Sequence, residues 1–232
     1  MKVFQEGDGL ELPLLYKTLK AEYELSETHY TFGGDSFRFL SVLDSYALLD
    51  RISPEEFIKD EQMPYWAEIW PSAITLSSFI VDELMLPGLR VIEIGAGVGM
   101  VSVVAASRGA NVLATDYSLE ALRFVRYNSL KNRVNLACER LDWRLVQCGE
   151  QFDLLLAADV LYERVNLLPI VTAIDKLLKP GGAAYLADPR RRLAEQFLEL
   201  AAENNFSITS FPRKYIGGSR DVLVNIYKMT RQ

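Results

Sequence analysis

The sequence predicts a single α/β domain built on a mainly parallel sheet, and three observations predict this class. From about residue 90 onward, short β-rich apolar runs alternate with helical patterns, which is typical of βαβ units. Of the 232 residues, 50% are hydrophobic and 24% are charged, so a sizeable core is available. The length fits one large domain or a domain with an added lobe. Disordered and fibrous classes are excluded.

Pattern alone places seven strands and the helices between them. The segment Lys179-Pro180-Gly181-Gly182 is a typical stop for the helix before it. The glycine-containing turn Ile216–Ser219 favours an antiparallel hairpin of the last two strands. The predicted strands cover residues 90–94, 111–115, 134–138, 153–158, 182–187, 206–211 and 221–228, and the predicted helices cover 99–108, 118–131, 164–178 and 190–204.

Residues 1–88 have a different pattern, and we interpret them as an N-terminal lobe packed on a core of residues 89–232. The alternation of polar and apolar residues in 23–43, around a Gly-Gly-Asp turn, predicts a hairpin. Ser53–Glu56 has capping-box spacing for a short helix, and Pro71–Leu84 predicts an amphipathic helix. No linker composition separates this lobe from the core.

Charge and residue counts exclude several function classes. With 25 basic and 31 acidic residues the net charge is −6, which argues against a nucleic-acid or membrane surface. Cys138 and Cys148 fit no zinc pattern and predict a reducing compartment such as the cytoplasm. The single histidine, His29, rules out a site of several imidazoles, so no metal site is expected. No apolar run of membrane-spanning length occurs.

The first predicted core strand ends in a glycine turn that leads directly into a helix, as in nucleotide-type cofactor sites. The spacing differs from the dinucleotide fingerprint, which requires glycine or alanine at the position of Met100. Glu93, two residues before the first glycine, suits a cationic cofactor better than a pyrophosphate. The three glycines are Gly95, Gly97 and Gly99.

Asp116 ends the second predicted strand, where a carboxylate accepts hydrogen bonds from ribose hydroxyls. With Asp116, the E-x-G-x-G-x-G pattern at 93–99 and the segment Leu178–Gly182, the sequence resembles the seven-strand, Rossmann-like methyltransferases. The resemblance implies S-adenosylmethionine as cofactor. It also implies a mixed sheet of order 3-2-1-4-5-7-6, with the last strand antiparallel and helices on both faces.

A closer resemblance rests on three further segments: Tyr65–Ser72 before the core, Leu141–Trp143 after the third strand, and Asp159–Tyr162 after the fourth. Over about residues 60–190 the sequence is similar to methyltransferase family sixteen. That family contains protein lysine methyltransferases, including the enzyme that acts on the electron transfer flavoprotein beta subunit. The resemblance therefore implies methylation of a lysine on a protein substrate.

The candidate catalytic residues are Asp159 and Tyr162, which match the D/E-x-x-Y/F motif of that family. A carboxylate orients an amine, and an aromatic face tolerates the partial positive charge on a transferring methyl. The alternative is that Asp159 caps the next helix and Tyr162 fills the core. The candidate cofactor-binding residues are Glu93, Gly95, Gly97, Gly99, Asp116, Tyr117, Asp142, Trp143, Trp70 and Ala158.

Several questions stay open at this level. We expect the run Arg190-Arg191-Arg192 to be a solvated surface, with contact to an acidic substrate or partner as the alternative. The segment Glu6–Tyr23 contains no motif that we interpret. A small-molecule N-methyltransferase, with an amine or nicotinamide-like acceptor and an enclosed pocket under the N-terminal lobe, is the first alternative function. A non-catalytic cofactor-binding protein is the second. The oligomeric state is not indicated.

Overall fold

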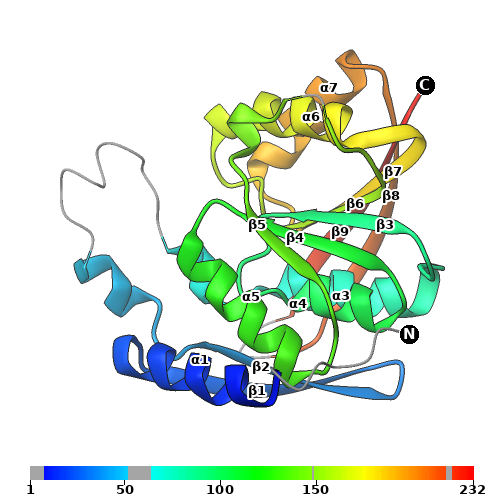
Figure 1. The fold of residues 1–232 in the computed structure, drawn as a ribbon. Coiled ribbons are helices and arrows are strands. Elements are labelled where there is room, and N and C mark those ends of the chain that lie inside the picture. Colours follow the sequence, from blue (N-terminus) through cyan, green and yellow to red (C-terminus); the bar gives the residue numbers. More distant parts are fainter. Residues whose placement is uncertain (1–7, 52–63, 148, 218–220) are drawn as a thin grey trace.

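The computed structural model describes residues 8–51, 64–147, 149–217 and 221–232. Its centre is a seven-stranded sheet in the order β5-β4-β3-β6-β7-β9-β8, which confirms the predicted order (Figure 1). The strands from β5 to β7 are parallel, and β9 runs antiparallel to both of its neighbours. The strands are β3 (Arg90–Ile94), β4 (Asn111–Asp116), β5 (Ala137–Arg140), β6 (Phe152–Ala158), β7 (Leu178–Asp188), β8 (Phe206–Tyr215) and β9 (Val222–Arg231).

Helices cover both faces of this sheet (Figure 1). On one face α3 (Pro71–Glu83), α4 (Met100–Ser107) and α5 (Leu119–Lys131) bury one apolar cluster, and on the other α6 (Leu167–Leu177) and α7 (Arg192–Glu203) bury a second. Parallel strands covered on both faces read as continuous apolar runs, which is why they could be placed from the sequence. Within the described residues, no helix is long and apolar enough to cross a membrane.

The N-terminal elements form a further layer outside α5: α1 (Asp8–Glu22) and the hairpin of β1 (Leu25–Phe32) and β2 (Asp35–Val42) (Figure 1). The predicted hairpin is confirmed, and His29 lies exposed on it. Helix α1 was not predicted. The division of the chain at residue 88 stays a prediction, and α3, which precedes it, packs directly against β7, β8 and β9.

The buried amide of Asn128 in α5 joins this layer to the core. Its Nδ2 donates to the carbonyls of Leu40 (3.0 Å) and Val98 (2.8 Å), and its Oδ1 accepts from the Leu40 amide (2.8 Å). Leu40 lies in β2 and Val98 lies in the glycine turn. One side chain therefore satisfies backbone groups of the hairpin and of the turn, which would be costly to leave unpaired.

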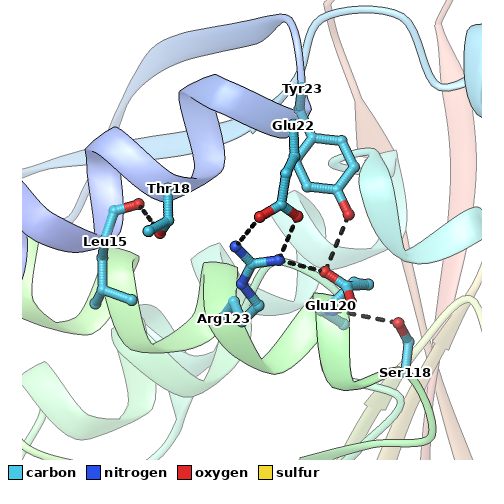
Figure 2. A network of polar contacts seen from close by, with 8 residues as sticks. Leu15, Thr18, Glu22, Tyr23, Ser118, Glu120 and Arg123 are labelled. Carbon is cyan, nitrogen blue, oxygen red and sulfur yellow. Dashed lines mark hydrogen bonds and ion pairs between the residues drawn. The ribbon is translucent and has the colours of Figure 1, made fainter.

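A charged network fixes the end of α1 on the first turn of α5 (Figure 2). Arg123 pairs with Glu22 (2.6 Å) and with Glu120 (2.7 Å), and the Tyr23 hydroxyl donates to Glu120 (3.0 Å). The Tyr23 ring then packs edge-on against Trp66, with 6.0 Å between centroids. The N-terminal helix thus supports a tryptophan that lies next to the glycine turn.

Four strands differ from their predicted bounds by more than one residue. Strands β8 and β9 extend to Tyr215 and Arg231, beyond the predicted 211 and 228, because the two strands pair along their full length. Strand β5 is Ala137–Arg140 and not 134–138, because residues 137–140 pair with β4 after the turn that closes α5. Strand β7 begins at Leu178, four residues before the predicted 182, so Lys179–Gly182 is an irregular start of a strand that follows the helix end at Leu177. The capping box Ser53–Glu56 lies outside the described residues. The short 3-10 helices are η1 (Tyr46–Arg51), η2 (Tyr65–Ala67), η3 (Trp143–Leu145) and η4 (Arg164–Asn166).

Candidate active site

A cleft opens at the carboxyl ends of β3, β4 and β6, where open α/β sheets bind their ligands. Its other walls come from η3 and from residues 65–73, between η2 and the start of α3. All the predicted site residues except Gly99 line this cleft. The tertiary structure therefore brings together segments that the sequence could connect only by resemblance.

The glycine turn needs glycine for both conformation and space. Gly95 and Gly97 have φ of +67° and +55°, which side chains other than glycine rarely adopt. A Cβ on Gly95 would lie 3.0 Å from Val160, and one on Gly97 would lie 3.2 Å from the Trp66 carbonyl oxygen. Gly99 also has a positive φ, of +87°, and precedes α4; a Cβ there would meet Val125 of α5 at 3.1 Å.

Two buried carboxylates support this turn. Glu93 is 1% exposed and accepts hydrogen bonds from the Ser102 amide (2.8 Å) and the Ser102 hydroxyl. Asp116 accepts from the amides of Gly97 (2.8 Å) and Ser118 (2.9 Å). Burial raises the pKa of Glu93 to about 8 and that of Asp116 to about 6. A cationic ligand in the cleft would favour the ionised forms of both groups.

Aromatic and charged side chains form the next wall of the cleft. Asp142 accepts a hydrogen bond from the Arg144 amide (2.9 Å) at the start of η3 and pairs with the Arg144 guanidinium (2.8 Å), which lowers the pKa of this carboxyl. Trp143 packs over Gly95 at 3.3 Å from its would-be Cβ. Tyr117 carries the guanidinium of Arg140 on its ring, at 4.5 Å. These flat surfaces suit a planar base.

Residues before α3 close the cleft on one side. The Trp70 indole donates to the Tyr65 carbonyl (2.8 Å), and both side chains line the cleft. Trp66 also lines the cleft, and its ring packs against Phe124, with 5.4 Å between centroids. The two tryptophans do not form one helical stripe, because Pro71 starts a new helix after them.

Asp159 follows β6 in a left-handed conformation, with φ of +61°, and is only 7% exposed. Its amide donates to the Ala187 carbonyl (2.9 Å) and its Oδ1 pairs with Arg191 Nη2 (2.7 Å). Burial raises the pKa of the Asp159 carboxyl, and Arg191 and Ser72 oppose that rise. The structure assigns the following helix caps to Glu163 and Asn166, so the helix-cap interpretation of Asp159 is wrong.

Tyr162 faces the same end of the cleft. Its ring lies 4.9 Å from that of Tyr65, centroid to centroid, and the Arg191 guanidinium lies 6.0 Å from its centroid. Tyr65 is 39% exposed and forms part of the rim. Two aromatic rings therefore meet near the exposed rim, and the Asp159 carboxylate lies buried at the same end of the cleft.

Arg191 is the main residue that the sequence analysis misjudged. The expectation of a solvated arginine run is wrong for Arg191, which lines the cleft and is half-buried, and it holds for the exposed Arg190 and Arg192. The position after β7, at the same sheet edge as Asp159, was the available signal. The cleft is also lined by Glu68, Ile69, Ser118, Glu163 and Asn166, which the sequence analysis did not single out.

The fold and this site define the class: a seven-strand methyltransferase whose methyl donor is S-adenosylmethionine. The glycine cradle, the strand-end carboxylate of Asp116 and the indole of Trp143 fit that group. Residues 57–204 match the family model described as lysine methyltransferase. The chain belongs to this family, as the resemblance implied.

Individual relatives agree with that assignment. The chain is 37% identical over 129 residues to the bovine protein-lysine methyltransferase METTL21E, covering 50% of this chain and 44% of the relative. It is 30% identical to mouse EEF1A lysine methyltransferase 3, covering 70% and 71%. The chain thus spans less than half the length of the bovine relative.

Solved structures agree on the fold. The 16S rRNA N2 G1207 methyltransferase of T. thermophilus, in complex with AdoMet and guanosine, superimposes with a TM-score of 0.64 at 13% identity, covering 90% of this chain and 51% of that one. At this identity the match shows the fold alone.

Proposed function

We propose that this protein transfers a methyl group from S-adenosylmethionine to the ε-amine of a lysine in a protein substrate. One observation carries the proposal: a single cleft contains both the glycine cradle and the group formed by Asp159, Tyr162 and Tyr65. The cradle fits the donor, and the carboxylate with two rings fits an amine on an aliphatic stem. Family membership and the named lysine methyltransferases among the relatives support this acceptor.

When bound, S-adenosylmethionine would supply a sulfonium methyl carbon for in-line attack by an amine, with the thioether as the leaving group. The amine must be neutral to attack, because an ammonium has no free lone pair. The amine nitrogen forms the new bond to carbon while the carbon–sulfur pair leaves with sulfur. In this proposal Asp159 accepts a hydrogen bond from the amine and orients it, while the rings of Tyr162 and Tyr65 hold the stem and exclude water.

The relatives and the family suggest particular acceptor proteins, which the fold alone would not. EEF1A, named in the mouse relative, and the electron transfer flavoprotein beta subunit, named for the family, are the two defined acceptors that we would test first. The net charge of −6 disfavours a nucleic-acid acceptor or a membrane surface. With two cysteines in the chain, we propose the cytoplasm as its location.

A small-molecule acceptor is the alternative, and it predicts an enclosed pocket under the N-terminal lobe. Of the lobe's described residues, several of those between 65 and 73 line the cleft, whereas none from α1, β1 or β2 does. The partly exposed Tyr65 at the rim favours access for a side chain carried by a large molecule.

The test is incubation of the purified protein with methyl-tritiated S-adenosylmethionine and a cell extract. We expect label on a protein band, as methyl-lysine, and its loss in Asp159→Ala. Label confined to small molecules would replace the protein acceptor by the alternative. Cofactor binding without transfer to the extract or to either defined acceptor would contradict catalysis.

A further inference from the structure

One guanidinium contacts three parts of the Asp159–Tyr162 motif. Arg191 Nη2 pairs with Asp159 Oδ1 at 2.7 Å, and Arg191 Nη1 donates to the Asp159 carbonyl at 3.1 Å. The same group lies 6.0 Å from the Tyr162 ring centroid. A planar fork with fixed donors suits this arrangement, and a lysine ammonium would not reproduce it.

The backbone that Arg191 holds is strained. Asp159 has φ of +61°, a conformation that residues other than glycine adopt at a cost in free energy. Its amide donates to Ala187 in β7, and its carbonyl accepts from Arg191 beyond the end of β7. The Asp159 residue is therefore held on both sides by one segment of chain, which fixes the direction of its side chain.

Arg191 is itself fixed. Its amide donates to Asp188 Oδ1 at 2.7 Å, and Asp188 is fully buried at the end of β7. Arg191 also occupies the cap position of α7. A buried acid, a strand end and a helix start thus determine where the guanidinium lies.

The neighbouring arginines provide an internal comparison. Arg190 is exposed, and its Nε donates to Asn225 Oδ1 (3.3 Å) on β9. Arg192 is exposed on the first turn of α7. Neither lines the cleft. Substituting Arg190 or Arg192 therefore removes a positive charge near the start of α7 without removing a contact to Asp159.

The pairing also solves a charge problem of the proposed reaction. A bare carboxylate beside a lysine would favour its ammonium form, which cannot attack. An ionised carboxylate in a nearly buried position is also costly unless it is paired. The guanidinium offsets the charge of Asp159, and the carboxylate keeps acceptor capacity for an amine N–H, since its two oxygens offer about four lone-pair sites.

We propose that Arg191 is a positioning residue for methyl transfer: it holds Asp159 in its strained conformation, neutralises its charge and leaves it able to orient the acceptor amine. This inference rests on the proposed function, because it gives Asp159 a task in that reaction.

The groups around Asp159 set the sign of the expected pH effect. Arg191 and Ser72 of α3 favour the carboxylate, whereas burial and the nearby Asp188 oppose charge here. Tyr162, Glu163 and Tyr65 are further titratable side chains at this end of the cleft, and the charge of Asp116 acts on Tyr162. Removal of the guanidinium should therefore raise the pKa of Asp159 and move the acidic limb of the turnover profile to higher pH.

The experiment compares Arg191→Gln and Arg191→Lys with the matched controls Arg190→Gln and Arg192→Gln. Three measurements are made on each variant: the ¹³C carboxyl titration of Asp159 in the ligand-free protein, assigned with Asp159→Asn; the pH profile of turnover; and calorimetric S-adenosylmethionine affinity. For Arg191→Gln we expect a raised pKa of the Asp159 carboxyl, turnover lowered at least tenfold near neutral pH, and cofactor affinity within about threefold of wild type. Arg191→Lys should recover part of the loss, and both controls should match wild type.

The double variant Asp159→Asn/Arg191→Gln should be no slower than Asp159→Asn alone, because in this proposal Arg191 acts only through Asp159. Multiplicative losses, an unchanged Asp159 titration in an active Arg191→Gln, or an equal effect of Arg190→Gln would overturn the inference and leave the proposed function intact. Absence of any transfer by the wild type would overturn the proposed function, and with it the task given to Arg191. If Arg191→Gln does not fold, Arg191→Lys carries the same comparison.

Discussion

The two ends of the cleft are built in different ways. At the glycine end, formed by Glu93, Gly95, Gly97 and Asp116, all the hydrogen-bond partners of the two carboxylates lie within 19 residues: Ser102 is nine residues from Glu93, and Ser118 and Gly97 are two and 19 residues from Asp116. At the aspartate end, formed by Asp159, Tyr162 and Arg191, the interacting residues are far apart in sequence. Arg191 lies 32 residues from Asp159. The glycine end is built within one βαβ unit, from β3 to the start of α5, whereas the aspartate end also needs the later segment that follows β7.

The difference predicts that the two ends fail separately. Asp159→Asn keeps the shape of the side chain and removes its charge, so we expect turnover to fall at least about 100-fold, since positioned polar groups contribute on that scale. S-adenosylmethionine affinity, measured by calorimetry, should stay within about threefold, because the glycine end is intact. Asp175→Asn, on the outer side of α6, is the control. A large loss of cofactor affinity in Asp159→Asn would mean that the two ends are not separable.

Gly97→Ala tests the opposite end. The added Cβ would lie 3.2 Å from the Trp66 carbonyl in a backbone with φ of +55°. We expect the free energy of unfolding to fall by about 2 kcal/mol and cofactor affinity to fall about tenfold. Denaturant titration and calorimetry measure both effects. Gly149→Ala, where open space surrounds the Cβ, should change neither. Wild-type S-adenosylmethionine affinity in Gly97→Ala would show that the turn accommodates a Cβ at this position.

The buried acids at the glycine end give a pH signature. Burial raises the pKa of Glu93 to about 8, so between its ordinary value and pH 8 the folded protein holds a proton that the unfolded chain has released. Stability therefore falls as pH rises through that window, by up to about 1.4 kcal/mol per pH unit. Glu93→Gln should flatten this slope in ligand-free protein, as followed by denaturant titration from pH 5 to 8. Identical slopes for variant and wild type would refute a protonated Glu93.

The smallest expected effect lies outside the cleft. Tyr23→Phe removes the hydroxyl that donates a hydrogen bond to Glu120 (Figure 2). It keeps the ring against Trp66. We expect a loss of about 0.5–1 kcal/mol in the free energy of unfolding and unchanged turnover. The exposed Tyr46→Phe serves as the control. A clear fall in turnover would contradict this expectation and would mean that the N-terminal layer affects the site as well as the stability of the fold.

Several features could be read directly from the chain. The positions of most strands rest on apolar periodicity, and the glycine turn with its acid and the Asp116 position rest on short spacings. The hairpin of β1 and β2 rests on its alternation, which marks one buried face. The strand order came only from the family resemblance, and the structure confirms it. Helix α1 was missed because its apolar residues form no clear stripe, and it carries Pro13.

Other features were decided only by tertiary structure. Three consecutive arginines look alike in the sequence, and folding sends Arg191 into the cleft while Arg190 and Arg192 remain on the surface. The pairing of β7 with β6 turned Lys179–Gly182 from a helix stop into the irregular start of a strand. Nothing in the local sequence indicates that Asn128 hydrogen-bonds both the hairpin and the glycine turn. The physical reason is common to all three: short-range patterns record backbone conformation and burial, whereas the partner of a buried charge or amide depends on which distant segments the packed sheet brings into reach.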